Sequence, residues 1–295
     1  MNYLEKATVD RRISIRLYVD KIAKFLCLLA TLFGVVMLAI LLFRVFSDGI
    51  SAINVNFLTA KLSTIPEKAG IMGAILGTFW LMVVVAPVTM FFGIGTAVYI
   101  ELYTKESRLQ SFIKMNIANL AGVPSIVYGI LGMTIFVRAM NLGNSVLAGG
   151  LTIALLILPI TIVATQEALR AVPTHLSEGA IGMGATKWQT IRTIILPAAL
   201  PAILTGAILS ISRAIGETAP LVVIGIPALL IPFPSGILDK FTVLPMQIYY
   251  WTVDSVLMEE YAALAAGTII VLLFVLLICN LAAILIRRKF NQAYY

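Results

Sequence analysis

The chain has 295 residues, of which 60% are hydrophobic and only 12% are Asp, Glu, Lys or Arg, with a formal net charge of +7. Soluble domains contain roughly 45–50% apolar and about 25% charged residues, so this chain has too few charges to cover a water-soluble surface. With a mean hydropathy of +1.02, the composition excludes a soluble enzyme, a disordered tail and a nucleic-acid-binding module. It indicates a polytopic, all-α membrane protein.

Six apolar stretches are long enough to cross a hydrocarbon core of about 30 Å as helices. In chain order they are 25–43, 70–100, 115–137, 139–166, 193–212 and 261–286. Gly and Pro are tolerated there because neighbouring helices satisfy the freed backbone groups, and we expect kinks in the second and fifth helices. The sequence therefore predicts one domain of six transmembrane helices over 25–286, a basic N-terminal tail at 1–24 and a C-terminal tail at 287–295.

A further uncharged stretch, 218–238, is also long enough to span a membrane. It contains Pro220, Pro227, Pro232 and Pro234, and a regular lipid-exposed helix does not accommodate four prolines. We expect its beginning to form a kinked end of the fifth helix and the remainder to be external or re-entrant.

Lys and Arg residues are distributed unevenly between the two sets of loops. Fifteen of the 21 lie in the N-terminal tail, in the loops after the second and fourth spans, and at the C-terminus, whereas four lie in the other loops. The remaining two, Arg44 and Arg213, lie at or within helices. Because cytoplasmic loops carry the excess of positive charge, both termini are predicted to be cytoplasmic, as six spans require.

Few residues of this chain suit metal binding or covalent chemistry. Cys27 and Cys279 lie in apolar stretches and His175 is the only histidine, so we expect neither a disulfide framework nor a metal site. The glycine-rich stretch before Lys187 lacks the Gly-Lys-Ser/Thr of an ATP-binding loop. The sequence thus predicts no catalytic residue and no cofactor bound by this chain, and any ATP would be hydrolysed by a separate subunit.

The longest polar segment on the predicted cytoplasmic side extends over about 167–197. Thr174 is predicted to cap a short helix that the following glycines end. Thr186 stands three residues before Gln189, the spacing of a capping box, which predicts the start of a second helix. A helix–turn–helix of this kind, with small residues along one face, is either a structural loop or a docking element for a partner protein.

This polar segment resembles the EAA loop of ABC importer permeases. The residues that carry the resemblance are Glu178, Gly179, Ala180, Gly184, Ile194, Leu196 and Pro197. The family pattern has alanine where this chain has Gly179. The resemblance implies the ABC importer permease fold and an ATPase subunit whose groove receives the short helix. It also implies that Glu178, Gly179, Ala180 and Gly184 couple the membrane domain to that ATPase.

Two charged residues lie at the end of the fifth apolar stretch. Arg213 and Glu217 are four residues apart, so on a helix they share one face and can pair. Charges inside a membrane are costly and mark either a substrate path or a polar contact between helices. Arg138, at the outer end of the third stretch, is a further candidate for the path, or its side chain extends to the lipid headgroups.

A second resemblance is to the permeases of Pst-type phosphate importers, the PstA type in particular. It is carried by the stretch Arg-Ala-Ile-Gly-Glu-Thr-Ala-Pro-Leu at 213–221 and by Gly-Val-Pro-Ser-Ile-Val-Tyr-Gly at 122–129, and it covers nearly the whole chain. It implies a bacterial inner membrane protein that imports inorganic phosphate. In such a protein we expect Arg213 to attract the anion and Glu217 to orient the arginine and prevent overly tight binding. The implied partners are a homologous permease (PstC type), an ATPase dimer (PstB type) that binds ATP and Mg²⁺, an external phosphate-binding protein (PstS type) and the lipid bilayer, with no nucleic acid.

Other functions remain open at this point. An importer of another oxyanion, such as sulfate, molybdate or phosphonate, would carry the same EAA loop. An ion-coupled secondary carrier would need ionisable residues for the coupling ion near the midplane and usually an internal repeat. We find no repeat, and Glu217 is the only strong candidate carboxylate within the predicted spans. A membrane-embedded enzyme is disfavoured because His and acidic clusters are nearly absent.

Overall fold

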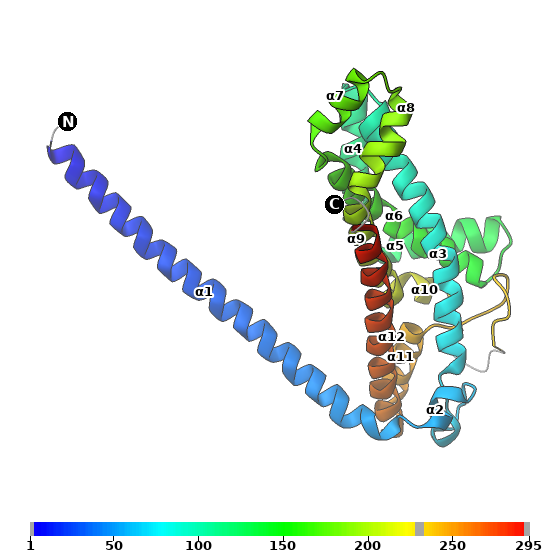
Figure 1. The fold of residues 1–295 in the computed structure, drawn as a ribbon. Coiled ribbons are helices and arrows are strands. Elements are labelled where there is room, and N and C mark those ends of the chain that lie inside the picture. Colours follow the sequence, from blue (N-terminus) through cyan, green and yellow to red (C-terminus); the bar gives the residue numbers. More distant parts are fainter. Residues whose placement is uncertain (1–2, 228–232, 292–295) are drawn as a thin grey trace. The chain divides into compact units, whose positions relative to one another are not determined.

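The computed structural model describes residues 3–227 and 233–291, and nearly all regular structure in them is helical (Figure 1). The exception is an isolated antiparallel bridge between Ser145 and Lys240. The chain divides into two compact units, Met1–Asp48 and Gly49–Tyr295. The last four residues of the predicted C-terminal tail, 292–295, lie outside the described residues, as does Pro232 of the proline-rich stretch.

The first unit is made almost entirely of one helix, α1 (Tyr3–Gly49). Its candidate membrane span, Arg16–Ala52, has a mean hydropathy of 2.9 and is not buried within this chain. Apolar side chains are exposed on all its faces, among them Phe25, Phe33 and Leu41, as expected for a helix surrounded by lipid or by other spans. From Tyr3 onward, the predicted basic tail and the first predicted span therefore form one continuous helix.

Four further spans belong to the second unit. They are α3 (Met72–Val98) continued by the π-helix η3 (Tyr99–Tyr103), then α6 (Val146–Arg170), then α8 (Lys187–Thr190) with the π-helix η5 (Ile191–Ile195) and α9 (Leu196–Gly216), and finally α12 (Glu260–Asn291). Among the described residues, five helices are long and apolar enough to cross a membrane, or six if a bent pair counts as one span. The predicted all-α fold with six spans is thus confirmed, with the third span as the bent pair.

The third span differs from the prediction of one helix over 115–137. It consists of α4 (Arg108–Leu120) and, after a bend of 97°, α5 (Ser125–Gly132) continued by the π-helix η4 (Met133–Ala139). Pro124 has φ −54° and ψ 135° and stands at the start of α5. Proline lacks an N–H and disfavours helical geometry in the residue before it, so an otherwise apolar helix ends here.

Between α9 and α12, the described residues form short elements and no seventh span. Helix α9 ends at Gly216, and Glu217 is extended with φ −74° and ψ 123°, so the expected kinked continuation is instead a separate helix, α10 (Ala219–Ile224). Gly225 ends α10 with φ 77°, a left-handed conformation that glycine adopts readily. Later, α11 (Leu244–Asp254) precedes α12. The short elements before α3 are η1 (Ile50–Ala52), α2 (Val55–Thr59) and η2 (Pro66–Lys68).

Close helix contacts form the core of the second unit. A Cβ at Gly93 of α3 would approach the Thr161 side chain of α6 to 2.8 Å, and one at Gly150 of α6 would approach Val84 of α3 to 2.6 Å. Glycines at these contacts let the two backbones lie close together, which is how helices associate where lipid replaces water. Around this pair, buried apolar residues such as Ile157, Leu221 and Phe241 complete one cluster.

The loop that holds Asp239 closes the N-terminal end of α6. Backbone carbonyls of Ile237 and Asp239 accept hydrogen bonds from the N–H groups of Leu147 and Val146, at 2.8 and 3.0 Å, which satisfies donors that a helix start leaves unpaired. The hydroxyl and backbone N–H of Ser235 donate to the Asp239 carboxylate at 2.7 and 2.9 Å. These hydrogen bonds hold the pKa of Asp239 below its ordinary value.

Candidate functional site

The predicted EAA loop forms a compact segment between α6 and α8 at residues 171–186, which we call the α7 segment. It contains α7 (Thr174–Gly182). Because α6 continues to Arg170 and α8 begins at Lys187, the segment is shorter than the predicted 167–197. Pro173 precedes the helix, and no side chain caps it, so the prediction that Thr174 is the cap was wrong.

The end of the α7 segment has the local structure predicted for it. Gly184 has φ +86°, and the N–H groups of Gly184 and Ala185 donate to the carbonyls of Ile181 and Ala180 at 2.9 and 3.0 Å, which closes the end of α7. Thr186 Oγ1 then accepts from the N–H of Gln189 at 3.3 Å, while Gln189 Oε1 accepts from the N–H of Thr186 at 2.8 Å. The predicted capping box is confirmed.

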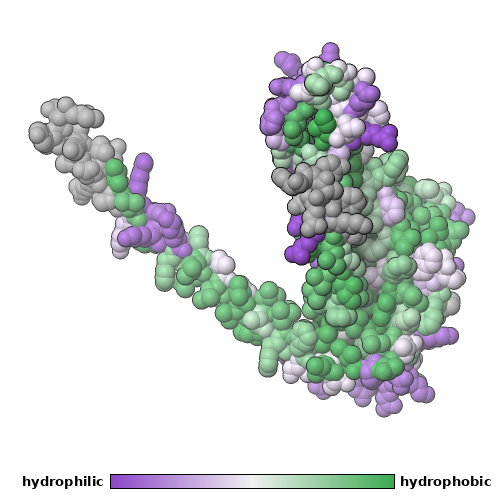
Figure 2. Space-filling model, viewed as in Figure 1, coloured by the Kyte–Doolittle hydropathy of each residue, from purple (hydrophilic) through white to green (hydrophobic). Residues whose placement is uncertain are grey.

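The α7 segment and α8 expose large apolar side chains and glycines on one surface. Met183 is 90% exposed, and Ile181 and Trp188 are more than half exposed. A Cβ built at Gly179 or Gly182 would meet nothing within 4 Å. Figure 2 shows hydrophilic residues around a small apolar patch at this end of the second unit. Glu178 is exposed with this surface, whereas Ala180 points inward and is buried, so the motif residues do not share one face.

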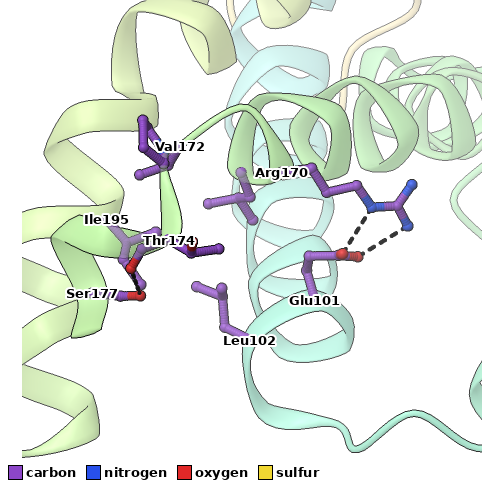
Figure 3. Close-up of a pocket in the computed structure, with 9 residues that line it drawn as sticks. Glu101, Leu102, Arg170, Val172, Thr174, Ser177 and Ile195 are labelled. Carbon is purple, nitrogen blue, oxygen red and sulfur yellow. Dashed lines mark hydrogen bonds and ion pairs between the residues drawn. The ribbon is translucent and has the colours of Figure 1, made fainter. Parts of the chain in front are cut away.

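A charged cluster adjoins the N-terminal end of the α7 segment. Glu101 of η3 accepts hydrogen bonds from Arg170 Nε at 2.8 Å and Arg170 Nη2 at 3.3 Å (Figure 3). Lys114 Nζ of α4 lies 2.9 Å from the same carboxylate. Arg170 also contacts Glu167 at 2.9 Å. A cavity of about 280 Å³ adjoins the cluster, lined also by Leu102, Val172, Thr174, Ser177 and Ile195. Sequence reasoning missed this cluster because its residues come from three different helices.

Arg213 and Glu217 form the pair that their spacing predicts. Arg213 Nε lies 3.3 Å from Glu217 Oε1, with side-chain exposures of 52% and 16%. Arg213 belongs to the last turn of α9, whereas Glu217 follows the helix in extended conformation. The contact therefore joins the end of α9 to the start of the irregular backbone before α10. Arg138 lies exposed in η4, and no hydrogen bond or ion pair within the described part of the chain joins it to this pair.

Two hydrogen bonds between α9 and α12 show at which level of the α12 span the Arg213–Glu217 pair lies. Ser212 Oγ bonds to Asn280 Oδ1 at 2.5 Å, and Arg287 Nη1 donates to Thr205 Oγ1 at 3.0 Å. Thr205 and Ser212 are as far apart along α9 as Asn280 and Arg287 are along α12, and the partners follow in the opposite order. The two helices therefore run antiparallel in a fixed register. At about 1.5 Å of rise per residue, Glu217 lies near the level of residue 275 of α12. That level falls in the central third of the α12 span, Glu260–Leu285.

Comparison with known proteins identifies a family over most of the chain. The family described as "Binding-protein-dependent transport system inner membrane component" matches residues 90–291. The chain is 33% identical over 174 residues to the probable ABC transporter permease protein YqgI of Bacillus subtilis, which covers 59% of each chain. It is 30% identical over 271 residues to the phosphate transport system permease protein PstA of Pasteurella multocida, covering 92% of this chain and 95% of that protein. The PstA 1 protein of Mycobacterium tuberculosis is 34% identical over 232 residues.

Solved structures of ABC transporters share the fold. The bacterial alginate ABC transporter, in complex with its alginate pentasaccharide-bound periplasmic protein, matches 90% of this chain and 94% of its own with a TM-score of 0.61 at 16% identity. An inward-facing MetNI methionine ABC transporter matches 72% of this chain and 93% of its own with a TM-score of 0.59 at 17% identity. At these identities the likeness concerns the fold alone.

Proposed function

The chain belongs to the family of inner membrane components of binding-protein-dependent transport systems, and we propose that it is the permease subunit of an ATP-driven importer for inorganic phosphate. As a member of this family it is a non-catalytic, multi-pass permease of the inner membrane. An importer of this class also contains a partner permease, an ATPase and an external binding protein. In our proposal these are of the PstC, PstB and PstS types, and the ATPase binds the ATP and Mg²⁺.

The observation that carries the proposal is the Arg213–Glu217 pair at mid-depth of the membrane span. A charged residue at the centre of a membrane helix costs about 2.5–3.5 kcal/mol by insertion scales. Among the described residues, the hydrogen bond from Arg213 to a carboxylate is made by Nε, at 3.3 Å from Glu217 Oε1. The two terminal nitrogens of its planar guanidinium can then bind oxygens of a phosphate in a fork. Glu217 orients the arginine and limits how tightly the anion is held, because a conducting site must also release its ion.

The names of relatives support phosphate as the substrate. The proteins from Pasteurella multocida and Mycobacterium tuberculosis are named phosphate transport system permeases. The first of them aligns with 92% of this chain, which includes most of its spans. The Bacillus subtilis relative YqgI has no substrate in its name. The names of these relatives therefore favour phosphate as the substrate of this chain.

The α7 segment is the proposed docking element for the ATPase. Its exposed surface combines Ile181 and Met183 with glycines whose hydrogens face open space, and Trp188 of the adjoining α8 is exposed beside it. Small residues permit close approach of a partner's surface, and exposed apolar side chains at such a site favour protein contact. Glu178, Gly179 and Gly184 would lie at this contact, while Ala180 packs inward and supports the helix.

Phosphate uptake into vesicles that contain the four purified components tests the proposal. Arg213→Gln should abolish most uptake and Arg213→Lys should retain part of it, because lysine keeps the charge but lacks the fork. Exchanging Arg213 and Glu217 should also abolish uptake while the complex still assembles. Arg44 is a matched control, since it too forms a pair with an acidic residue four positions later, Asp48 at 3.7 Å. Arg44→Gln should leave uptake unchanged.

The same vesicles distinguish phosphate from other oxyanions. Excess unlabelled sulfate or molybdate should not compete with labelled phosphate. Near-normal uptake by Arg213→Gln, or by the exchanged pair, would show that Arg213 is not the phosphate contact. Uptake of sulfate in place of phosphate would assign the importer to another oxyanion.

A further inference from the structure

The π-helix η3 contacts the two residues that flank the α7 segment, which we take as its two ends. Its Glu101 accepts two hydrogen bonds from Arg170, the last residue of α6, at 2.8 and 3.3 Å. The ring of its Tyr103 lies beneath Lys187 Nζ, which is 5.1 Å from the ring centroid, and Lys187 is the first residue of α8. The residue before the α7 segment and the residue after it therefore both contact η3.

The Glu101 contact joins three helices. Glu101 continues α3, Lys114 belongs to α4, and Arg170 ends α6. The Glu101 side chain is only 15% exposed, compared with 66% for Glu167, the other carboxylate that Arg170 contacts. A shielded carboxylate held by an arginine fork and an ammonium is a stronger tie than an exposed pair, because water screens it less.

Between its two ends, the α7 segment is loosely packed against η3. The cavity of about 280 Å³ lies between Leu102 of η3 and Thr174 and Ser177 of α7 (Figure 3). A second cavity of about 150 Å³ also borders Leu102 and Ser177, and extends to Ile181. Tightly packed interiors transmit displacement directly, whereas cavities absorb it. A displacement of α7 therefore reaches η3 through the two end contacts more than through the space between them.

We propose that Glu101 and Tyr103 of η3 form a clamp through which the α7 segment moves the cytoplasmic ends of α3 and α4 during transport. They are positioning residues and touch neither substrate nor nucleotide. The clamp makes η3, α4 and the segment move as one rigid body, which is how small shifts at one site become movements of whole helices. The π-helical turn suits this role, because π segments occur often at functional sites. The inference rests on the proposed docking of the α7 segment on the ATPase.

Matched substitutions test the clamp in the complete importer. Glu101→Gln and Tyr103→Leu should assemble normally but lower the phosphate transported per ATP hydrolysed by about fivefold or more, the lower range of allosteric coupling. Glu167→Gln removes the exposed partner of Arg170, and Tyr99→Leu changes an exposed tyrosine of the same π-helix. Both controls should keep the parental ratio. A parallel loss of assembly, hydrolysis and uptake at a constant ratio would show that η3 is merely structural and overturn the inference.

Stimulation of ATP hydrolysis by the binding protein provides a readout that does not depend on the substrate. The binding protein acts outside and the ATPase inside, so the stimulation must pass through the permease. Glu101→Gln should reduce this stimulation while basal hydrolysis persists. If the parent importer shows stimulation but no phosphate uptake, the proposed substrate fails and the clamp is still tested. Full stimulation in both Glu101→Gln and Tyr103→Leu would refute the clamp.

A covalent clamp completes the test. Cys27 and Cys279, both free and exposed, are first replaced by serine. Tyr103→Cys and Lys187→Cys are then joined by a short thiol cross-linker in the presence of Glu101→Gln. If the contact must stay closed while the α7 segment moves, cross-linking should restore transport per ATP toward the parental ratio. Unchanged or further reduced coupling after complete cross-linking would contradict the clamp.

Discussion

Gly129 of α5 packs directly against Pro220 of α10, where a Cβ at position 129 would come within 2.8 Å of the proline Cα and 2.9 Å of Val223 Cβ. The two residues belong to the two stretches, 122–129 and 213–221, that carry the resemblance to permeases of Pst-type importers. Only glycine lets the two helices lie this close. Because α10 begins just after Glu217, this contact also positions the end of the backbone that carries the charged pair.

A side chain at position 129 should therefore displace α10. Gly129→Val is expected to destabilise the protein by about 1–3 kcal/mol, the usual cost of overpacking, and to lower phosphate uptake more than it lowers assembly. Gly95→Val is the control, since a Cβ at Gly95 of α3 meets nothing within 4 Å. Thermal unfolding in detergent and uptake in vesicles measure the two effects. Equal stability of the two variants would contradict the close packing of α5 on α10.

A bulky residue at Gly179 should block docking of the α7 segment without disturbing this chain. A Cβ there meets nothing within 4 Å, and unlike Gly184 the residue does not have a positive φ. Gly179→Trp should insert and fold normally but bind the ATPase weakly, so uptake is lost. Gly184→Trp should have the same effect with additional local strain. Co-purification of the ATPase measures docking, and normal co-purification with normal uptake in Gly179→Trp would exclude this surface as the docking site.

The hydrogen bond between Ser212 and Asn280 should stabilise the α9–α12 contact modestly. Hydrogen bonds between membrane helices contribute about 0.6 kcal/mol on average and up to about 1.7. A double-mutant cycle with Ser212→Ala and Asn280→Leu should give a coupling energy in that range, measured by unfolding in detergent. Thr193→Ala is a control, because its hydroxyl bonds only to a carbonyl one turn earlier, that of Gln189. Strict additivity of the two substitutions would mean that the register of α9 and α12 does not depend on this pair.

Reporter fusions test the orientation derived from the charge distribution. A reporter after Tyr295 or near Arg108 should be cytoplasmic, and one near Lys61 should be external, because the Lys and Arg residues are concentrated on one side of the membrane. Paired reporters that are active on opposite sides of the membrane give the answer at each position. A C-terminal reporter that is active only outside would rule out six spans with both termini inside.

The sequence alone determined the features that depend on local composition. Apolar length places the spans, since crossing a bilayer needs about 20 apolar residues wherever they occur. The capping box of Thr186 and Gln189 was predictable because its hydrogen bonds join residues within one turn. The pairing of Arg213 with Glu217 was predictable for a similar reason, as the two residues are four apart in the chain.

The tertiary structure decided what depends on neighbours distant in the chain. Apolar composition does not reveal that the third span bends by 97°, because Gly122 and Pro124 are tolerated in membrane helices and break one only where other elements accommodate the bend. The level of Glu217 against α12 follows from hydrogen bonds between α9 and α12, and its spacing from Arg213 does not reveal that its backbone is extended. The Glu101–Arg170–Lys114 cluster arises only when three spans meet. Charges pair with whichever opposite charge the packing brings near, and the packing of helices is a property of the whole fold.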